Sequence, residues 1–505
     1  MANIQTRSSI LAVKVESTEG TPVVPAAGTD AVALQADFTM EPAFDTLTND
    51  ELKASIGQAK PIQGLENPTV GFSHYLRSSG VEGQEVNFGA LVYSALGAKS
   101  VASTEYDTFN GSSTSTIVMP SSEGANFERG EALLIKDSTN GYRIRAVHSV
   151  SGDNLSLSFV LPNAPASGVN LGKCVLYKPA NSSHPTLSVW HYLGNSGAVQ
   201  MMAGGRVTSM DIDITAGELI NASYGIDGLA YYFDPIEITS STRYLDWTND
   251  DGTFAAAVTA KWYKDPHELA EALQTAMNTA STGETATVSY SNSTGKFTIT
   301  STGSVLSLLF NSGTNTANTI ATKIGFSAAS DQTGTAAGTG YTSANAITLT
   351  FPYTASYDNA DPLAAKNHEI MIGSQSDYVC FGASAVSVSI ANEKADQLSV
   401  CAESGRSGSI IATRTVTMSV TSLLSQYDAE KMKSFRKNDE IRLQYSFGAK
   451  SGGNWVAGKC GCIYIPTAVI TSISITDEDG LATLNLELQA FVDSSGNGEA
   501  YIGTL

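Results

Sequence analysis

The sequence predicts a mainly β protein: two tandem β-sandwich or half-barrel repeats, each with a short helix, plus an inserted small β-module and an inserted α+β domain. Three observations lead to this fold class. Only 15% of the 505 residues are charged, and the chain is rich in Ser, Thr, Ala and Gly, which is typical of β proteins. A hairpin pattern at Gly205 to Phe233 returns at Thr467 to Asp493. A strand, turn and helix pattern at Pro68 to Leu96 returns at Arg414 to Asp439.

The repeated hairpin is predicted from a period of two. In the first copy, apolar residues alternate with Asp211 and Asp213, and in the second copy they alternate with serines. Such alternation is typical of half-buried strands. The copies are 263 residues apart, from Val207 to Ile470. Keeping the apolar face of the second strand in phase predicts a separation of 264 after the turn.

The strand and helix pattern supports the duplication independently. Val70 and Val416 are 346 residues apart, which exceeds the hairpin separation by 346 minus 263, or 83 residues. The first half should therefore carry an extra segment of about that size between its helix and its hairpin. The second helix is expected to bury Met432 and Phe435. Chance similarity between two polar, β-rich stretches remains the alternative to duplication.

These patterns divide the chain into four parts. The parts are an N-terminal arm at residues 1–30, a first repeat at 31–241 with a β-module inserted at 98–180, an α+β surface domain at 242–343, and a second repeat at 344–505. Within the first repeat, Glu41 to Asn67 is expected to be a long polar connection, which is uncommon in a compact domain unless it has a function. The second repeat is expected to resume with a strand at Ala346 to Phe351.

The inserted α+β domain is predicted from a change of pattern. Asp265 to Ala280 has helical spacing of apolar residues and a proline near its start. Val288 to Ser301 is expected to be a hairpin, and Ala317 to Ile324 a second helix. The run from Ser327 to Ser343 is rich in Gly, Thr and Ser, and is expected to be a flexible exit.

Charge excludes several function classes. The formal net charge is −20 and the pI is about 4.7, whereas a protein that grips nucleic acid or an anionic membrane needs a basic surface. The first residues lack the apolar core of a signal peptide, and no stretch is apolar enough to span a membrane, so a cytoplasmic origin is expected.

No motif for chemistry is found, so no enzyme activity, catalytic residue, cofactor or metal site is predicted. There is no G-x-S-x-G elbow, P-loop or EF-hand loop, and the six histidines are dispersed. The five cysteines are an odd number, and Cys460 and Cys462 form only a C-x-C without nearby histidines, so small buried side chains are the favoured role. Asp211 and Asp213 are either a carboxylate pair or, more usually for this pattern, a solvated strand face.

Three stretches carry a resemblance to a known family. They are RSSILAVKVESTEGTPVVPAAGTDAV near the start, LSVWHYLGNSGAVQMMAGGRVTSMDIDITAGELINASYGIDG before residue 230, and ATRTVTMSVTSLLS followed by AVITSISITDEDGLATLNLELQAF near the end. Together they resemble the tail tube (major tail) proteins of long-tailed bacteriophages, over about residues 1–235 and 345–505. The resemblance rests on ordered β-patterns and small-residue turns and on no catalytic signature. Residues 242–343 depart from the basic pattern and resemble decoration modules of other phage tail proteins.

The resemblance implies a structural virion protein of the phage tail, assembled in the host cytoplasm. Its subunits would join their sheets into closed rings, and the stacked rings would form a conduit for DNA ejection. The implied partners are other copies of the chain, a tape measure protein and tail-end proteins; genomic DNA would pass through without specific binding, and no membrane is implied.

Two repeats in each chain have a consequence for the ring. Three chains, with pseudo-sixfold symmetry, would then complete it, and a hexamer with one repeat displaced outward is the alternative. About twenty-four strands, tilted by ~45° and ~4.7 Å apart, give a backbone barrel roughly 50 Å across, which leaves room for a duplex. The candidate acids of its wall are Asp211, Asp213, Asp227 and Glu487.

Two other function classes stay open. A surface adhesin or glycan-binding β-sandwich protein fits the composition, although an export signal would be expected. A virion-associated glycan hydrolase would need two carboxylates that flank a cleft.

Overall fold

The computed structural model describes the chain except residues 1–5, 27, 52–55, 138–140, 195–196, 282, 336–339, 348, 350–353, 359, 381, 425–436, 479, 495 and 497. Over the described residues the fold is mainly β, which confirms the predicted fold class. The predicted second-repeat helix, with Met432 and Phe435, lies outside the described residues. So do three of the six residues of the predicted strand at Ala346 to Phe351, and the described Ala346, Ile347 and Leu349 are not in a strand.

The described residues form two α-helices, four short 3-10 turns and 33 strands. The helices are α1 (Gly89–Leu96) and α2 (Pro266–Ala280), and the 3-10 turns are η1 (Thr6–Ser8), η2 (Gly124–Asn126), η3 (Thr316–Asn318) and η4 (Ala321–Ile324). The strands up to α2 are β1 (Ile10–Val15), β2 (Ala31–Val32), β3 (Thr39–Glu41), β4 (Phe44–Leu47), β5 (Ile62–Glu66), β6 (Thr69–Tyr75), β7 (Gly97–Val101), β8 (Thr116–Val118), β9 (Ala132–Asp137), β10 (Gly141–Ser151), β11 (Asn154–Leu157), β12 (Val175–Pro179), β13 (Leu187–Leu193), β14 (Ala198–Thr215), β15 (Asn221–Asp227), β16 (Ala230–Phe233), β17 (Ile236–Glu237), β18 (Tyr244–Asn249), β19 (Gly252–Ala257) and β20 (Trp262–Tyr263). The later strands are β21 (Ala286–Ser291), β22 (Lys296–Ser301), β23 (Leu306–Leu308), β24 (Gln332–Thr335), β25 (Tyr341–Thr342), β26 (Glu369–Gly373), β27 (Tyr378–Cys380), β28 (Ala383–Leu398), β29 (Arg406–Leu423), β30 (Ile441–Ser451), β31 (Asn454–Glu478), β32 (Leu481–Ala490) and β33 (Tyr501–Thr504). None of the described helices is long and apolar enough to cross a membrane.

The chain divides into two compact units. One comprises residues 1–11, 188–203 and 230–353, and the other comprises residues 12–187, 204–229 and 354–505. The smaller unit has its own apolar core, in which Trp247, Leu273 and Phe297 are fully buried. Helix α2 begins where the sequence predicts, because the Asp265 carboxylate accepts a hydrogen bond from the Glu268 backbone N–H and Pro266 occupies the first turn.

Two predictions for this unit are wrong. The segment expected to be a second helix forms only the 3-10 turns η3 and η4, and η4 ends at Gly325 in the left-handed conformation (φ 78°). The run Ser327 to Ser343, expected to be a flexible exit, contributes strands β24 and β25 in its described part. Strand pairing with β23 and β22 satisfies its backbone groups and outweighs its loop-like composition.

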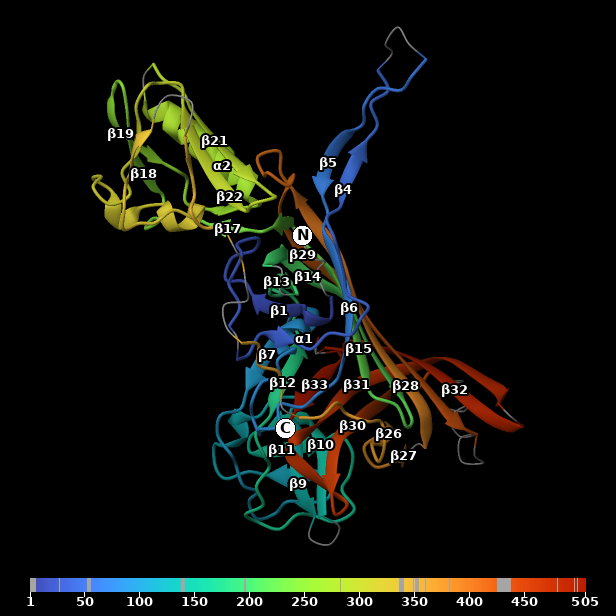
Figure 1. Cartoon of the computed structure of the whole chain (residues 1–505). Helices are drawn as coiled ribbons and strands as arrows, with labels where there is room; N and C mark the ends of the chain where they lie inside the picture. The colour runs from blue at the N-terminus through green and yellow to red at the C-terminus, as the bar shows by residue number, and fades with distance from the viewer. Residues whose placement is uncertain are drawn as a thin grey trace. The chain divides into compact units, whose positions relative to one another are not determined.

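The larger unit contains a sheet in which one four-stranded arrangement occurs twice. The first has the order β3, β6, β15, β14, and the second has the order β28, β29, β32, β31, all antiparallel. Strand β14 pairs with β28, so the two arrangements join edge to edge into eight consecutive strands. These strands can be followed in Figure 1 from the blue β6 through the green β15 and the orange β28 to the red β31 and β32.

A shared bulge fixes the equivalence of the two arrangements. The first strand of each hairpin has an extra residue, Thr208 in β14 and Thr471 in β31. The Thr208 hydroxyl donates to the Gly225 carbonyl at 3.3 Å, and the Thr471 hydroxyl donates to the Glu487 carbonyl at 3.2 Å. The separation of 263 therefore holds for the first strand, but Gly225 and Glu487 are 262 apart, so the predicted shift to 264 is wrong. The turn of the second hairpin is one residue shorter than the turn of the first. Because side chains alternate with a period of two, a turn one residue longer would put the same side chains on the apolar face, so the apolar pattern alone does not distinguish the two cases.

The segment between helix α1 and the first hairpin forms a small sheet. Its strands follow the order β8, β11, β10, β9, and its buried core includes Ile117, Leu133 and Leu155. The expected long connection after Glu41 is different from the prediction, because its described part forms the hairpin β4–β5. Phe44, Leu47 and Ile62 of this hairpin are exposed.

Candidate functional site: the polar face of the duplicated sheet

The eight-stranded sheet has one apolar face, buried in a core. On this face the Tyr224 ring stacks on Phe72 and His74, with ring centroids 5.6 and 5.5 Å apart. His74 also contacts Phe88, which precedes helix α1, at 4.7 Å. Burial lowers the pKa of His74 to about 4, so this histidine is a neutral core side chain at neutral pH.

The opposite face, here called the polar face, is small and polar over its whole width. Residues directly opposite each other on neighbouring strands have their side chains on the same face of the sheet, so the face of each residue follows from that of its partner. The polar face consists of Thr39, Glu41, Thr69, Gly71, Ser73, Tyr75, Ser209, Asp211, Asp213, Thr215, Asn221, Ser223, Gly225, Asp227, Ala385, Ser387, Ser389, Ala391, Thr415, Thr417, Ser419, Thr421, Ser472, Ser474, Thr476, Thr483, Asn485, Glu487 and Gln489. The five charged residues among them are all acidic. Arg206 lies opposite Asp227 by the same rule, but it is buried and donates to Ser409, the His184 carbonyl and Glu19.

All four predicted wall acids lie on the polar face. Asp211 and Asp213 are on β14, Asp227 is on β15, and Glu487 is on β32. Asp213 and Glu487 are exposed, and the other two are half-buried. Whether these residues line a bore stays a prediction. Sequence reasoning missed Glu41, although its alternation with the buried Met40 is the signal that could have found it.

None of the acids of this face is among the residues that line the cavities around Tyr445, Lys459 and Tyr357. Asp211 and Asp213 are two residues apart on one strand, so their backbones are separated by about 6.6 Å. The Ser387 hydroxyl, on the next strand, donates a hydrogen bond of 2.8 Å to Asp213. The polar face therefore presents hydroxyl and carboxylate groups, which form hydrogen bonds with water, and the carboxylates repel phosphate.

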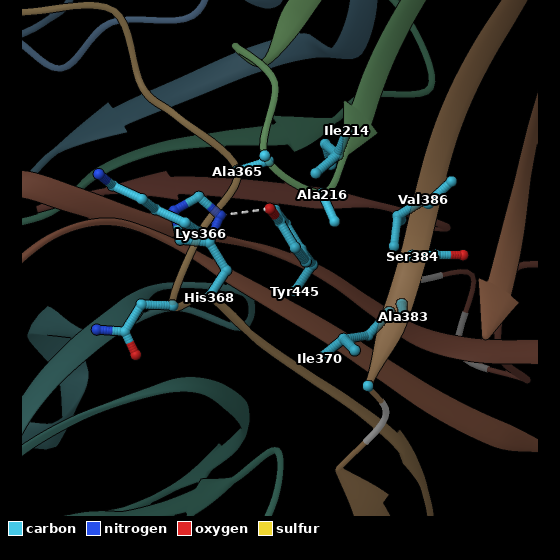
Figure 2. A pocket seen from close by; sticks show the side chains of 14 residues that line it. Ile214, Ala216, Ala365, Lys366, His368, Ile370, Ala383, Ser384, Val386 and Tyr445 are labelled. Atoms are coloured by element: carbon cyan, nitrogen blue, oxygen red, sulfur yellow. Dashed lines mark hydrogen bonds between the residues drawn. The ribbon is translucent and has the colours of Figure 1, made fainter. Parts of the chain in front are cut away.

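A cavity of about 350 Å³ lies at the end of the joint between β14 and β28. Figure 2 shows His368 and Tyr445 directed toward one another at this cavity, with Ile214, Lys366 and Ser384 among the other residues that line it. Its lining contains no carboxylate, so it does not favour the glycan hydrolase alternative.

Ser384 and His368 do not form a nucleophile and base at this cavity. The His368 Nδ1 atom is 2.6 Å from the Tyr445 hydroxyl, and its Nε2 atom accepts a hydrogen bond of 3.3 Å from the Gly448 backbone N–H. Both ring nitrogens are engaged, and burial lowers the pKa of His368 to about 4. The Ser384 hydroxyl donates to the Thr421 carbonyl at 3.3 Å. Among the described residues, no group of His, Cys, Asp and Glu is placed to hold a metal ion.

The sheet has two open edges. Beyond Ala468, strand β31 pairs with β32 on one side, and none of the described strands pairs on its other side. At the opposite end, β6 is the one partner of β3 among the described strands. Open edges present unpaired backbone N–H and C=O groups that can add a further strand.

Comparisons with known proteins add little to this description. No family model and no curated protein matches the sequence. One solved structure, described as "Virion of native gene transfer agent (GTA) particle", contains a chain that is 16% identical, with a TM-score of 0.20. The match covers 26% of this chain and 92% of that chain. Because so low a TM-score does not indicate a shared fold, the functional reasoning rests on the chain's own features.

Proposed function

We propose that this protein is a non-enzymatic structural subunit of a virion, which assembles into stacked rings that form the tail tube of a long-tailed bacteriophage. The observation that carries the proposal is the duplicated sheet with one open edge at each end. A sheet with two open edges and a buried apolar face can pair edge to edge with copies of itself, and closure into a ring removes every edge.

Ring size follows from the number of strands. Each chain supplies eight consecutive strands, so three chains supply about the twenty-four strands of a barrel roughly 50 Å across. The two arrangements within the chain would then alternate around a ring with pseudo-sixfold symmetry. Tape measure and tail-end proteins are the further partners that such a tube needs.

The polar face fits the wall of a DNA conduit. A curved sheet that buries its apolar face against helix α1 has its polar face on the opposite side, which is the side available to line a bore. DNA is held by Lys and Arg that neutralise phosphates, whereas the exposed charged residues of this face are acids. Its acids, including Asp211, Asp213, Asp227 and Glu487, would keep DNA from binding during ejection.

The α+β domain at residues 242–343 is proposed to lie outside the tube. Its buried core includes Trp247, Leu273 and Phe297, so it packs largely against itself. A domain of this size directed inward would obstruct the bore.

Electron microscopy of the purified protein at high concentration tests the proposal. Hollow rings or tubes, with three chains in each ring, are the expected result. Compact monomers at every concentration would refute the tube and favour a surface adhesin or glycan-binding protein. Six chains in each ring would refute the trimer alone.

A further inference from the structure

We propose that strand β31 of one chain pairs antiparallel with strand β3 of the next chain, in the register of the internal joint between β14 and β28. In this register Thr476 lies opposite Thr39 of the next chain, and Ile475 lies opposite its Met40. The inference rests on the proposed ring, because it names the two edges that close that ring.

The internal joint shows how the two arrangements fit together. Strands β14 and β28 pair over seven residues on each side, with Asp213 opposite Ser387 and Ile212 opposite Val388. On the polar face, the Ser387 hydroxyl donates to Asp213 at 2.8 Å. On the apolar face, Ile212 is only 2% exposed. The joint therefore combines a polar contact on one face with a buried apolar pair on the other.

The shared bulge transfers one side of this joint to β31. Because Thr208 corresponds to Thr471, Asp213 corresponds to Thr476 and Ile212 corresponds to Ile475.

The ladder transfers the other side to β3. Gly225 lies opposite Gly71, which lies opposite Thr39. In the second arrangement, Glu487 lies opposite Ser419, which lies opposite Ser387. Since Gly225 corresponds to Glu487, Thr39 corresponds to Ser387, and Met40 corresponds to Val388.

The exposure of Ile475 indicates that a strand belongs beside it. Ile475 is 50% exposed, whereas the corresponding Ile212 is 2% exposed. Both have an antiparallel neighbour on one side, β32 and β15 respectively, but only Ile212 has β28 on the other side. Met40 of a next chain would cover Ile475 as Val388 covers Ile212.

Neighbouring registers fit less well. A slip by two residues in one direction places Ile475 opposite Pro42, which has no N–H to donate to a ladder. A slip by two in the other direction places Thr476 opposite Asp37, whose carboxylate is already held by the backbone and hydroxyl of Ser73. In the proposed register Glu41, the one charged residue of β3, lies opposite Ser474.

Cysteine cross-linking tests the register. Directly opposite residues have Cα atoms about 4.5–5.5 Å apart, within the range of a disulfide, whereas diagonal ones are about 7–8 Å apart. The variant Thr39→Cys/Thr476→Cys, in a chain with the exposed Cys401 replaced by Ser, should form disulfides between chains under mild oxidation. Non-reducing gels should then show disulfide-linked dimers and closed trimers, and no species larger than a trimer.

Two control variants accompany this experiment, one for a disulfide at a known joint and one for a mismatched register. Asp213→Cys/Ser387→Cys, at the internal joint, should form a disulfide within one chain and thereby show that this geometry permits the bond. Glu41→Cys/Thr476→Cys differs by two residues of register and should link at most a few per cent as much. Two results would refute the register without refuting the tube. One is that the mismatched pair forms more disulfide than Thr39→Cys/Thr476→Cys. The other is that Thr39→Cys/Thr476→Cys assembles into tubes but stays unlinked, while the internal control forms its disulfide. Linked dimers and trimers without tubes would support the joint and refute the conduit; absence of both would refute both.

A charge exchange provides a readout that does not depend on disulfide formation. Thr39→Asp/Thr476→Asp should lower the amount of sedimenting assembly at least tenfold, because like charges would face each other across the joint. Thr39→Lys/Thr476→Asp should restore most of it. If both variants assemble like the unmodified chain, or if neither does while both fold, these residues do not face each other and the proposal is wrong.

Discussion

The pair Ile212 and Ile475 allows packing within the chain to be separated from packing between chains. Replacing either side chain by Ala removes three carbons, which is worth about 2.4 kcal/mol of transfer free energy when the side chain is fully buried. At Ile212, which is 2% exposed, a cavity adds to this cost, so Ile212→Ala should lower the free energy of unfolding of the free chain by about 3 kcal/mol. Ile475 is 50% exposed, so Ile475→Ala should cost the free chain only about 1 kcal/mol.

The remaining half of the Ile475 contribution should be lost on assembly. If Met40 of the next chain covers this side chain, Ile475→Ala weakens each joint by a further amount of about 1 kcal/mol, which is about fivefold in the association constant. Urea unfolding of dilute chain measures the first effect, and the protein concentration at which tubes begin to sediment measures the second. Leu423→Ala is the control matched in exposure. Leu423 is 54% exposed and lies opposite Thr483 on the polar face of β29, a strand that already has a partner on each side.

Equal shifts in the onset of assembly for Ile475→Ala and Leu423→Ala would refute the proposed contact between Ile475 and the next chain. The contact would also be refuted if Ile475→Ala destabilises the dilute chain as much as Ile212→Ala does, since Ile475 would then be buried without any neighbour.

Three further predictions concern the wall, the appended domain and pH. Asp211→Lys/Asp213→Lys should change the free energy of assembly by no more than about 0.5 kcal/mol, because neither side chain lies in the core, but should slow DNA passage; unchanged ejection rates in virions that carry it would count against a lumenal face. Joining residue 241 to residue 344 through a short Gly/Ser linker should still yield tubes in electron micrographs, thinner outside and unchanged in lumen, and folded subunits that cannot polymerise would place this domain in the assembly interface. Burial lowers the pKa of His74 from 6.5 to about 4, so its contribution to stability is complete above about pH 6.5 and is lost as the pH falls toward 4; His74→Phe should reduce the loss of unfolding free energy between pH 6.5 and 4, and an unchanged pH profile would contradict this.

Much of the duplicated sheet could be predicted because its cause is local. Alternation of Asp211 and Asp213 with apolar residues reports which face is buried, and that pattern survives in both copies. Helix α2 could be predicted for the same reason, since the Asp265 cap and Pro266 lie next to one another in the sequence.

What could not be predicted depends on distant parts of the chain. A turn one residue shorter and a turn one residue longer give the same apolar phase, so the separation after the turn could be placed only from the ladder. The apolar Phe44, Leu47 and Ile62 of the hairpin β4–β5 are exposed, so no buried face marks its strands, which are defined by each other. The cavity at His368 arises where segments far apart in sequence meet, and no spacing in the sequence reports it.

The two joints differ in length, and this difference has a mechanical consequence. Inside the chain, β14 and β28 share seven paired residues on each side, whereas β3 is only three residues long. A ring closed by β31 and β3 would thus alternate long seams with short ones, and the short seams would have fewer backbone hydrogen bonds to break. When such a tube bends or is pulled apart, strain should concentrate at the three short seams of each ring. Fragments torn from the wall should therefore be whole chains, each with its pair of repeats still joined.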